Sequence, residues 1–491
     1  MKKQITVLFV ALTFGIGIIG CDQFGLDEAQ PSQSVSADEA FTDLAGFEAS
    51  LTDLYDDLQS VTRYGQFYML YPSALSDNAD FIQGANRYNT VVENAPRTHL
   101  TDYGNPYDAI NLANNIITKI QDFDDFDSPN PQDVRDRIRG QALALRALNY
   151  FDLVRTKAYE PGREVDGFTD GVIVRTEPTE SPDDADFQAR ASNQEVYNLI
   201  VSDLETAIDL VAGKSIPDAR MNEAAVEALL ARVHLYLENW SQAANRAQSA
   251  LDANQRLGLA QMMTPDNFQS SWFSAENPEA LFELKMTQGQ DGAATSSNES
   301  LASLAFATDE TTFEGGDFRT FNFQVVPSED YVNTLPDDDA RRSIIDTLST
   351  GSAVLGKYNN SVATFTDNIP VIRLSEVHLT RAEALAESSG SVSEDAVDAL
   401  NTVRTNRGLD AVSTGDFSGP QEFVDEVLLE RRRELNYEGH RFFDLKRRAR
   451  SIPKPQTSLT DEIPYDDFRI LAPLPTGEVR SNPQLIQNPG Y

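Results

Sequence analysis

The sequence predicts a mainly α-helical protein in which helical hairpins carry an inserted, loop-rich lobe of mixed structure. Three observations support this fold class. Apolar residues recur at intervals of three and four over several long segments, which is the period of an amphipathic helix. Two alanine-rich segments, 224–251 and 371–403, each have the pattern of two helices joined by a short turn. The segment between them instead combines short strand-like pieces with polar and aromatic spacers.

The N-terminus indicates where the protein works. Two lysines precede an apolar run, 5–19, that is short for a membrane span and typical of a secretory signal. The sequence IIGC at 18–21 resembles a bacterial lipobox, although isoleucine stands where a small residue is commoner. Cys21 is the only cysteine, so an internal disulfide is excluded and lipidation is its predicted use. The alternative is an ordinary signal peptide with a chance cysteine.

Four parts follow from these patterns. Residues 1–20 are predicted to be a lipoprotein signal peptide, and residues 21–37, which are polar and lack helical periodicity, a tether. An N-terminal helical region with hairpins spans 38–260. A C-terminal region that contains the loop-rich insertion spans 261–491.

The surface is expected to be strongly acidic. The formal net charge is −37, from 40 basic and 77 acidic residues, and such a surface repels nucleic acid and anionic lipid head groups. Lysine is scarce, and a lysine-poor acidic surface suits concentrated salt, where charge repulsion is screened. We therefore predict a salt-loving source organism; the alternative is a cationic ligand.

Helical segments dominate the first half of the mature chain. The predicted helices lie within 38–58, 107–120, 138–154, 193–211 and 224–251. The segment 159–191 is rich in proline, glycine and aspartate and is predicted to be an excursion over the surface. The aspartates of 122–127 lack the pattern of a calcium loop, so a solvated linker is favoured over a metal site.

The segment 63–106 interrupts the helical pattern and is predicted to be a binding loop. It is rich in aromatic and amide side chains, and aromatic faces stack on sugar rings while amides and carboxylates bind hydroxyl groups. A glycan or a peptide is therefore the expected ligand, and the alternative is that most of these aromatics belong to the core. The candidate ligand contacts are Tyr68, Tyr71, Phe81, Asn86, Arg87 and Tyr88.

The two hairpins are expected to meet in space. The segment 224–251 resembles a tetratricopeptide hairpin, in which small residues such as Ala243 and Ala247 let two helices approach closely. The second hairpin, 371–403, begins about 150 residues later, which is far beyond one repeat period. The intervening residues 262–370 are therefore an insertion, with short strands expected near 279–284 and 324–326.

The C-terminal region contains the most specific motifs. A helix is predicted over 423–435, and the alternating charges of Glu430, Arg431, Glu434, Arg441 and Asp444 predict a structural network of ion pairs. The motifs are ERRRELNYEGHRFFDLKRR at 430–448, IPVIRLSEVHLTRAEALAE at 369–387, NTVRTNRGL at 401–409, RALNYFDLVR at 146–155 and the terminal QNPGY.

Together and in this order, these motifs resemble the SusD/RagB family of nutrient-binding outer-membrane lipoproteins, from about residue 38 to the end. The resemblance implies a SusD-like fold and an outer-membrane protein, lipid-anchored and facing the exterior. It also implies a partner, a TonB-dependent transporter of the SusC type, to which a captured oligosaccharide or peptide is delivered. The matched motifs are scaffold, whereas family members commonly place ligand contacts where Phe81–Asn89 lies here.

The sequence argues against catalysis. The four histidines are scattered, and HExxH, GxSxG, a phosphate-binding loop and a dinucleotide fingerprint are all absent from the sequence. We predict no catalytic residues, no metal and no cofactor. The alternatives to nutrient capture are a helical scaffold lipoprotein that binds no nutrient and a surface glycosidase, whose carboxylate pair is defined only in three dimensions.

Overall fold

The computed structural model describes residues 40–81, 88–126, 128–179, 186–217, 219–289, 291, 299–305, 312–313, 316–317, 325–347, 351–454 and 461–491. Helices dominate these residues. The N-terminal half contains α2 (Leu44–Leu58), α3 (Phe67–Ala74), α4 (Asn89–Val92), α5 (Gly104–Asp122), α6 (Pro131–Lys157), α7 (Asn193–Val211), α8 (Glu223–Tyr236) and α9 (Trp240–Leu257). The C-terminal half contains α10 (Phe268–Trp272), α11 (Leu301–Ala305), α12 (Glu329–Thr334), α13 (Leu374–Ser389), α14 (Glu394–Thr405), α15 (Pro420–Glu434), α16 (Arg441–Arg447) and α17 (Thr476–Ser481), with 3-10 turns η5 (Ala340–Ile344), η6 (Thr414–Asp416) and η7 (Phe468–Ile470).

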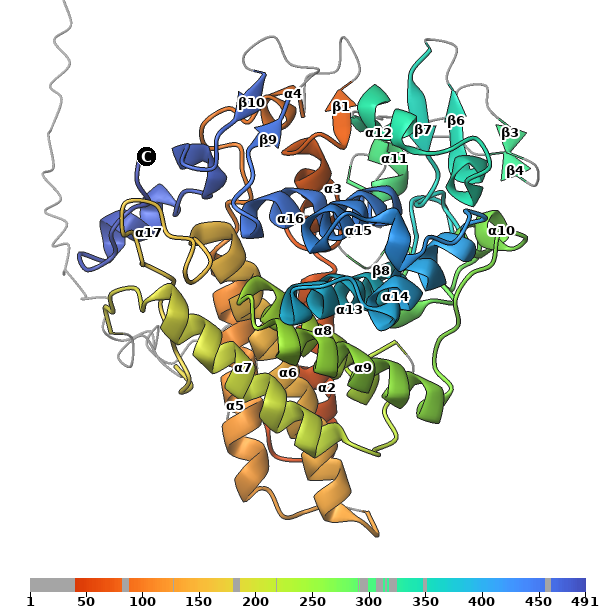
Figure 1. Cartoon of the computed structure of the whole chain (residues 1–491). Helices are drawn as coiled ribbons and strands as arrows, with labels where there is room; N and C mark the ends of the chain where they lie inside the picture. Colours follow the sequence, from red (N-terminus) through yellow and green to blue (C-terminus); the bar gives the residue numbers. More distant parts are fainter. Residues whose placement is uncertain are drawn as a thin grey trace, which may run out of the picture.

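The described strands are short and form antiparallel pairs. The pairs are β1 (Ala79–Phe81) with β5 (Val325–Pro327), β2 (Ala280–Leu284) with β8 (Ile369–Arg373), β3 (Thr312–Phe313) with β4 (Gly316–Asp317), β6 (Ile345–Thr347) with β7 (Ala353–Leu355), and β9 (Ile452–Pro453) with β10 (Glu462–Ile463). Most of them lie with the short helices at the upper end of the molecule in Figure 1, and the long helices α5, α6 and α7 extend away from them.

The first predicted hairpin is formed by α8 and α9. The Asn222 side chain caps α8 by accepting a hydrogen bond from the Ala225 N–H, 3.1 Å away. The turn before Trp240 includes Glu238 at φ +54°, and Gly258, in the left-handed conformation that glycine tolerates best, ends α9. Small buried residues of α9, among them Ala243, Ala247 and Ala250, let the two helices pack closely.

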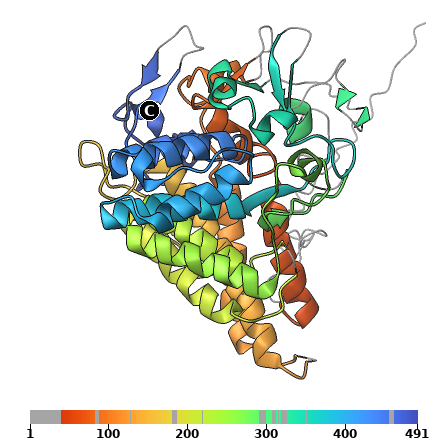
Figure 2. The same ribbon diagram turned by 45° about the vertical axis from the view of Figure 1, so that its right-hand side comes forward.

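The second hairpin, α13 and α14, packs directly on the first, as the sequence predicts. Helix α13 contacts both α8 and α9, and Figure 2 shows the α8–α9, α13–α14 and α15–α16 layers stacked on one another. A buried ion pair joins the hairpins, because Arg232 of α8 donates to both carboxylate oxygens of Glu376 of α13, at 2.6 Å each. The pairing of β2 with β8 closes the inserted lobe at its base.

Two differences from the predicted elements have physical reasons. The predicted loop 63–106 contains α3, β1 and α4, and seven of the eight residues of α3 are buried. Burial on nearly all sides removes the polar face that gives a helix its sequence periodicity. Val371, which the sequence assigns to the second hairpin, instead lies in β8, a fully buried strand that runs into α13.

The core is continuous through most of the molecule. One large cluster of buried apolar residues joins the N-terminal helices to the inserted lobe, and a smaller cluster lies among α13, α14 and α15. None of the helices in the described residues is both long and apolar enough to cross a membrane.

Candidate functional site

The C-terminal motif surrounds a buried hub of charge. Glu434, at the end of α15, accepts hydrogen bonds from Arg407 at 2.8 and 2.9 Å, from Arg373 at 3.1 Å and from Arg341 at 3.2 Å. Burial alone would raise the pKa of Glu434, but the arginines, led by Arg407 and Arg373, hold that pKa well below its ordinary value. The hub ties α15 to η5, β8 and the segment after α14, so it fixes the C-terminal layer to the inserted lobe.

Two arginines of the same motif hold the start of β1. Arg441 donates through Nε and Nη2 to the two carboxylate oxygens of Asp77, at 2.7 and 2.8 Å. Arg432 donates to the Asp77 carbonyl oxygen at 2.9 Å and to the Asn78 Oδ1 at 2.8 Å. Burial by itself would raise the pKa of Asp77, but the attraction of Arg441 and Arg432 outweighs this effect, so the pKa lies below its ordinary value. The predicted ion-pair network is present, and it includes Asp77, which lies 364 residues before Arg441 in the sequence.

A buried lysine joins the elements on either side of 82–87. The Lys454 Nζ donates to the carbonyl oxygens of Ala74, Ser76 and Val92, at 3.0, 3.2 and 2.8 Å. These carbonyls lie at the ends of α3 and α4, where helical carbonyls lack intrahelical donors. Burial lowers the pKa of Lys454 to about 7. We call the end of the molecule that carries β1 and α4 the β1–α4 end. Hydrogen bonds from Lys454 fix α3 and α4 to each other at this end.

Three of the predicted ligand residues are tyrosines at this end of the molecule. Tyr68, Tyr71 and Tyr88 are buried, with 1, 8 and 2% of each residue exposed, which favours the core alternative for these three rings. Tyr71 stacks on Phe67 with ring centroids 4.4 Å apart, and the Tyr88 hydroxyl accepts a hydrogen bond from the Gln66 amide at 2.6 Å.

The remaining predicted residues lie at or beyond the edge of the described structure. Phe81 is half-buried at the last position of β1, opposite Val325 of β5. Asn86, Arg87 and the predicted lipidation site Cys21 lie outside the described residues.

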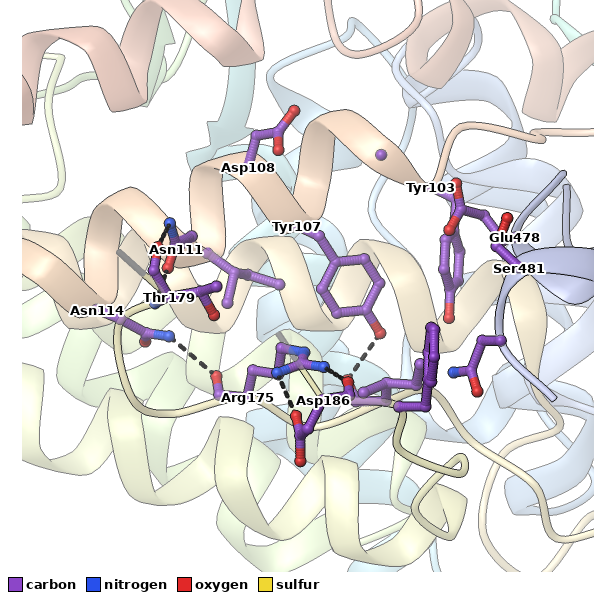
Figure 3. Close-up of a pocket in the computed structure, with 15 residues that line it drawn as sticks. Tyr103, Tyr107, Asp108, Asn111, Asn114, Arg175, Thr179, Asp186, Glu478 and Ser481 are labelled. Carbon is purple, nitrogen blue, oxygen red and sulfur yellow. Dashed lines mark hydrogen bonds and ion pairs between the residues drawn. The ribbon is translucent and has the colours of Figure 1, made fainter. Parts of the chain in front are cut away.

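A separate cavity of about 450 Å³ lies between α5, residues 173–179 and 186–187, and α17, and we call it the α5–α17 pocket. Figure 3 shows Tyr107 in the middle of it, with Tyr103 and Glu478 at one end and Asn111 and Asn114 at the other. The volume is typical of a small-molecule site. Sequence reasoning missed this pocket because its walls come from three distant segments, although Tyr103 was among the aromatics of the 63–106 segment.

Side chains of α5 and α6 hold one wall of the pocket in place. The Asn111 amide donates to the Thr179 carbonyl at 3.0 Å and accepts from the Thr179 N–H at 2.7 Å. The Tyr107 hydroxyl donates to the Ile173 carbonyl at 2.7 Å, and the Tyr150 hydroxyl bonds both the N–H and the carbonyl of Arg175, at 2.7 Å each. The segment 173–179 therefore has little conformational freedom even though it lies in a region without helix or strand.

The pocket combines an aromatic interior with an acidic rim. Tyr103 and Tyr107 lie with ring centroids 4.9 Å apart, and burial raises the pKa of Tyr103. Asp108 and Glu478 are exposed at the rim and form no ion pair within the described part of the chain. Arg175 is the cation among the lining residues, and its guanidinium is engaged by the Asp186 carboxylate at 2.9 Å. Such a site offers stacking surfaces and hydrogen-bond acceptors for a polyhydroxylated ligand.

The comparisons with known proteins cover both halves of the chain. A family model described as "SusD family" matches residues 305–491, and one described as "Starch-binding associating with outer membrane" matches residues 26–235. A SusD-like protein of Formosa agariphila is 26% identical over 553 aligned positions, which span 100% of this chain and 99% of that protein.

Solved structures of SusD-like proteins have the same fold. A putative sugar binding protein of Bacteroides vulgatus, 24% identical, superposes with a TM-score of 0.79 over 91% of this chain and 98% of its own. A laminarin binding SusD-like protein, 22% identical, superposes with a TM-score of 0.67 over 91% of this chain and 99% of its own. The predicted mainly helical, SusD-like fold is confirmed. The chain belongs to the SusD/RagB family, whose members are non-catalytic binding proteins and one of whose matching models describes association with the outer membrane.

Proposed function

We propose that the protein captures an oligosaccharide at the outer membrane and delivers it to a TonB-dependent transporter of the SusC type. The observation that carries the proposal is the likeness to SusD-like proteins along the whole chain, in sequence and in fold. Relatives of this fold are described as sugar binding and laminarin binding, and one matching family model is described as starch-binding. A carbohydrate is therefore favoured over a peptide as the ligand.

Lipidation of Cys21 would hold the protein at the membrane through the 21–37 tether. Two or more acyl chains on one residue give stable anchoring without a membrane-spanning helix. The Cys21→Ser variant is expected to lose incorporation of radiolabelled palmitate and to leave the membrane fraction. Unchanged labelling of this variant would contradict the anchor.

Phe81 and its neighbours are the proposed ligand contacts at the β1–α4 end. Arg441, Arg432 and Lys454 fix the backbone on both sides of 82–87, and residues that are fixed before binding lose less entropy when a ligand binds. Phe81 packs against the edge of the core but is only half-buried, and in this proposal its ring stacks on a sugar. Within this proposal the buried Tyr68, Tyr71 and Tyr88 stabilise this end of the molecule, and Asn86 and Arg87 supply polar contacts.

Calorimetric titration of the mature chain against neutral oligosaccharides and oligopeptides in high salt tests the proposal. Phe81→Ala is expected to weaken binding of the preferred oligosaccharide by about fivefold, because a lost aromatic stack is worth roughly 1 kcal/mol. Phe417→Ala is the matched control, since Phe417 is also half-buried but packs beside α14 and α15.

The control separates ligand contact from general destabilisation. Equal loss of binding in both variants would assign the effect to stability rather than to contact. Absence of binding to every sugar by a folded protein would overturn carbohydrate capture and favour the scaffold alternative. Turnover of a sugar by the purified protein would favour the glycosidase alternative.

A further inference from the structure

We propose that the α5–α17 pocket is a second carbohydrate site, distinct from the β1–α4 end, and that it takes a pyranose unit without an acid group. This inference rests on the proposed carbohydrate-binding function but assigns it an additional surface. In Figure 1, α17 lies at the side of the molecule, whereas β1 and α4 lie at its upper end. The two sites can therefore be altered separately.

An exposed aromatic side chain at the rim is the first observation. Phe187 is 59% exposed, which is unusual for so large an apolar side chain. Its backbone is nonetheless held, because the Gln484 amide donates to the Phe187 carbonyl at 2.5 Å and the Asn482 amide donates to the Gln188 carbonyl at 2.9 Å. A fixed backbone that presents an aromatic ring to solvent beside a cavity is a ready platform for the apolar face of a sugar.

The buried Tyr103 hydroxyl is the second observation. Tyr103 is 4% exposed and lines the pocket, and its oxygen has no hydrogen-bond partner of good geometry within the described residues. The Tyr103 hydroxyl lies beside the Tyr107 hydroxyl and the Ile173 carbonyl, so at this end of the pocket it retains hydrogen-bonding capacity that a ligand hydroxyl can use. The neighbouring Tyr107 hydroxyl already donates to the Ile173 carbonyl.

The charges at the rim determine the class of sugar. Asp108 and Glu478 accept hydrogen bonds but cannot donate them when ionised, which suits the hydroxyl groups of a neutral pyranose. A uronate or sulfated sugar would be repelled by these carboxylates and by the net charge of −37 of the chain. Arg175, the cation among the lining residues, already pairs with Asp186 and so is not available to neutralise an acidic sugar. Like charges at short range disfavour binding, so acidic sugars are excluded.

Binding of trisaccharides tests the inference. Calorimetry with maltotriose and laminaritriose is expected to show two sites per chain, and tri-galacturonate is expected to leave the pocket empty. Phe187→Ala should weaken one of the two sites at least about fivefold through the lost stacking surface. Ile486→Ala is the matched control, because Ile486 is also a strongly exposed apolar residue, 67% exposed, and is not among the residues that line the pocket.

Asp108→Asn provides a second test that does not depend on Phe187. Asp108 is exposed, so the variant should fold normally, and it is expected to weaken the neutral sugars at the pocket while admitting tri-galacturonate. Two sites that persist unchanged in both pocket variants would overturn the inference. Detection of one binding site per chain that is lost only in Phe81→Ala would also overturn the inference, but it would support the proposed function. No binding of any trisaccharide by the folded protein would overturn both.

Discussion

Two carboxylates, the buried Glu434 and the partly buried Asp57, show how the surroundings of a residue determine its pKa and its contribution to stability. Glu434 lies among three arginines, so its ionised form is favoured in the fold and its pKa is well below the ordinary value. Asp57 lies near one arginine, Arg63, at 3.1 Å, and also near the acidic side chains of Asp102 and Asp108. Burial, opposed by Arg63 and reinforced by these acids, raises the pKa of Asp57 to about 6.

Asp57→Asn is expected to stabilise the protein at pH 7. A carboxyl whose pKa is higher in the fold than in the unfolded chain stabilises the fold below its ordinary pKa, and this contribution disappears as the pH rises through 6. The gain in the free energy of unfolding should therefore be about 1–3 kcal/mol at pH 7 and absent near pH 4.

Urea unfolding at both pH values, in the same salt, measures this difference. Asp53→Asn, an exposed change on the same helix, is the control and should have a clearly smaller effect, because Asp53 makes the smallest of the contributions that raise the pKa of Asp57. A gain that is equal at pH 4 and pH 7 would contradict the titration of Asp57 as its cause.

At the scale of elements, side chains from the C-terminal helices determine the position of N-terminal ones. Strand β1 has three residues and pairs with β5, which also has three, so its ladder contributes few hydrogen bonds. The ion pairs from Arg441 and Arg432 to the residues just before β1 therefore carry much of its placement. The motif at 430–448 therefore positions β1, whose last residue, Phe81, is a proposed ligand contact.

Arg441→Gln is expected to loosen β1 without unfolding the protein. The change leaves the buried Asp77 carboxylate with weaker partners, and breaking a buried pair is worth about 3–5 kcal/mol locally. Hydrogen exchange should become faster at β1 and β5, and slow exchange should persist in α8 and α9. Arg450→Gln, which removes an exposed pair with Asp425, is the control. Unchanged exchange at β1 would show that the strand needs no such support.

At the scale of the whole molecule, charge is the dominant surface property. Buried arginines such as Arg373 and Arg407 are paired with buried carboxylates, so the excess of acids that gives the net charge of −37 remains on the outer surface. Repulsion among these acids opposes the compact state, and added salt screens it.

The thermal midpoint is therefore expected to rise when NaCl increases from 0.05 to 0.5 M, an interval over which the screening length falls from roughly 14 to 4 Å. Scanning calorimetry of the mature chain measures the midpoint. A flat or falling midpoint would contradict the salt-loving interpretation and favour a cationic ligand as the reason for the acidic surface. A variant with several exposed acids replaced by their amides should show a smaller rise.

The sequence by itself determined the family, the mainly helical fold and the two hairpins, because helical periodicity and motif order are local properties of the chain. Helices α7 and α8 begin within one residue of the predicted positions, where Ser192 and Asn222 cap them. Only the tertiary structure decided that Arg441 pairs with Asp77 and that Tyr68, Tyr71 and Tyr88 are buried. The α5–α17 pocket likewise exists only in the fold, since α5, residues 173–179 and 186–187, and α17 are brought together by packing, which leaves no local signal in the sequence.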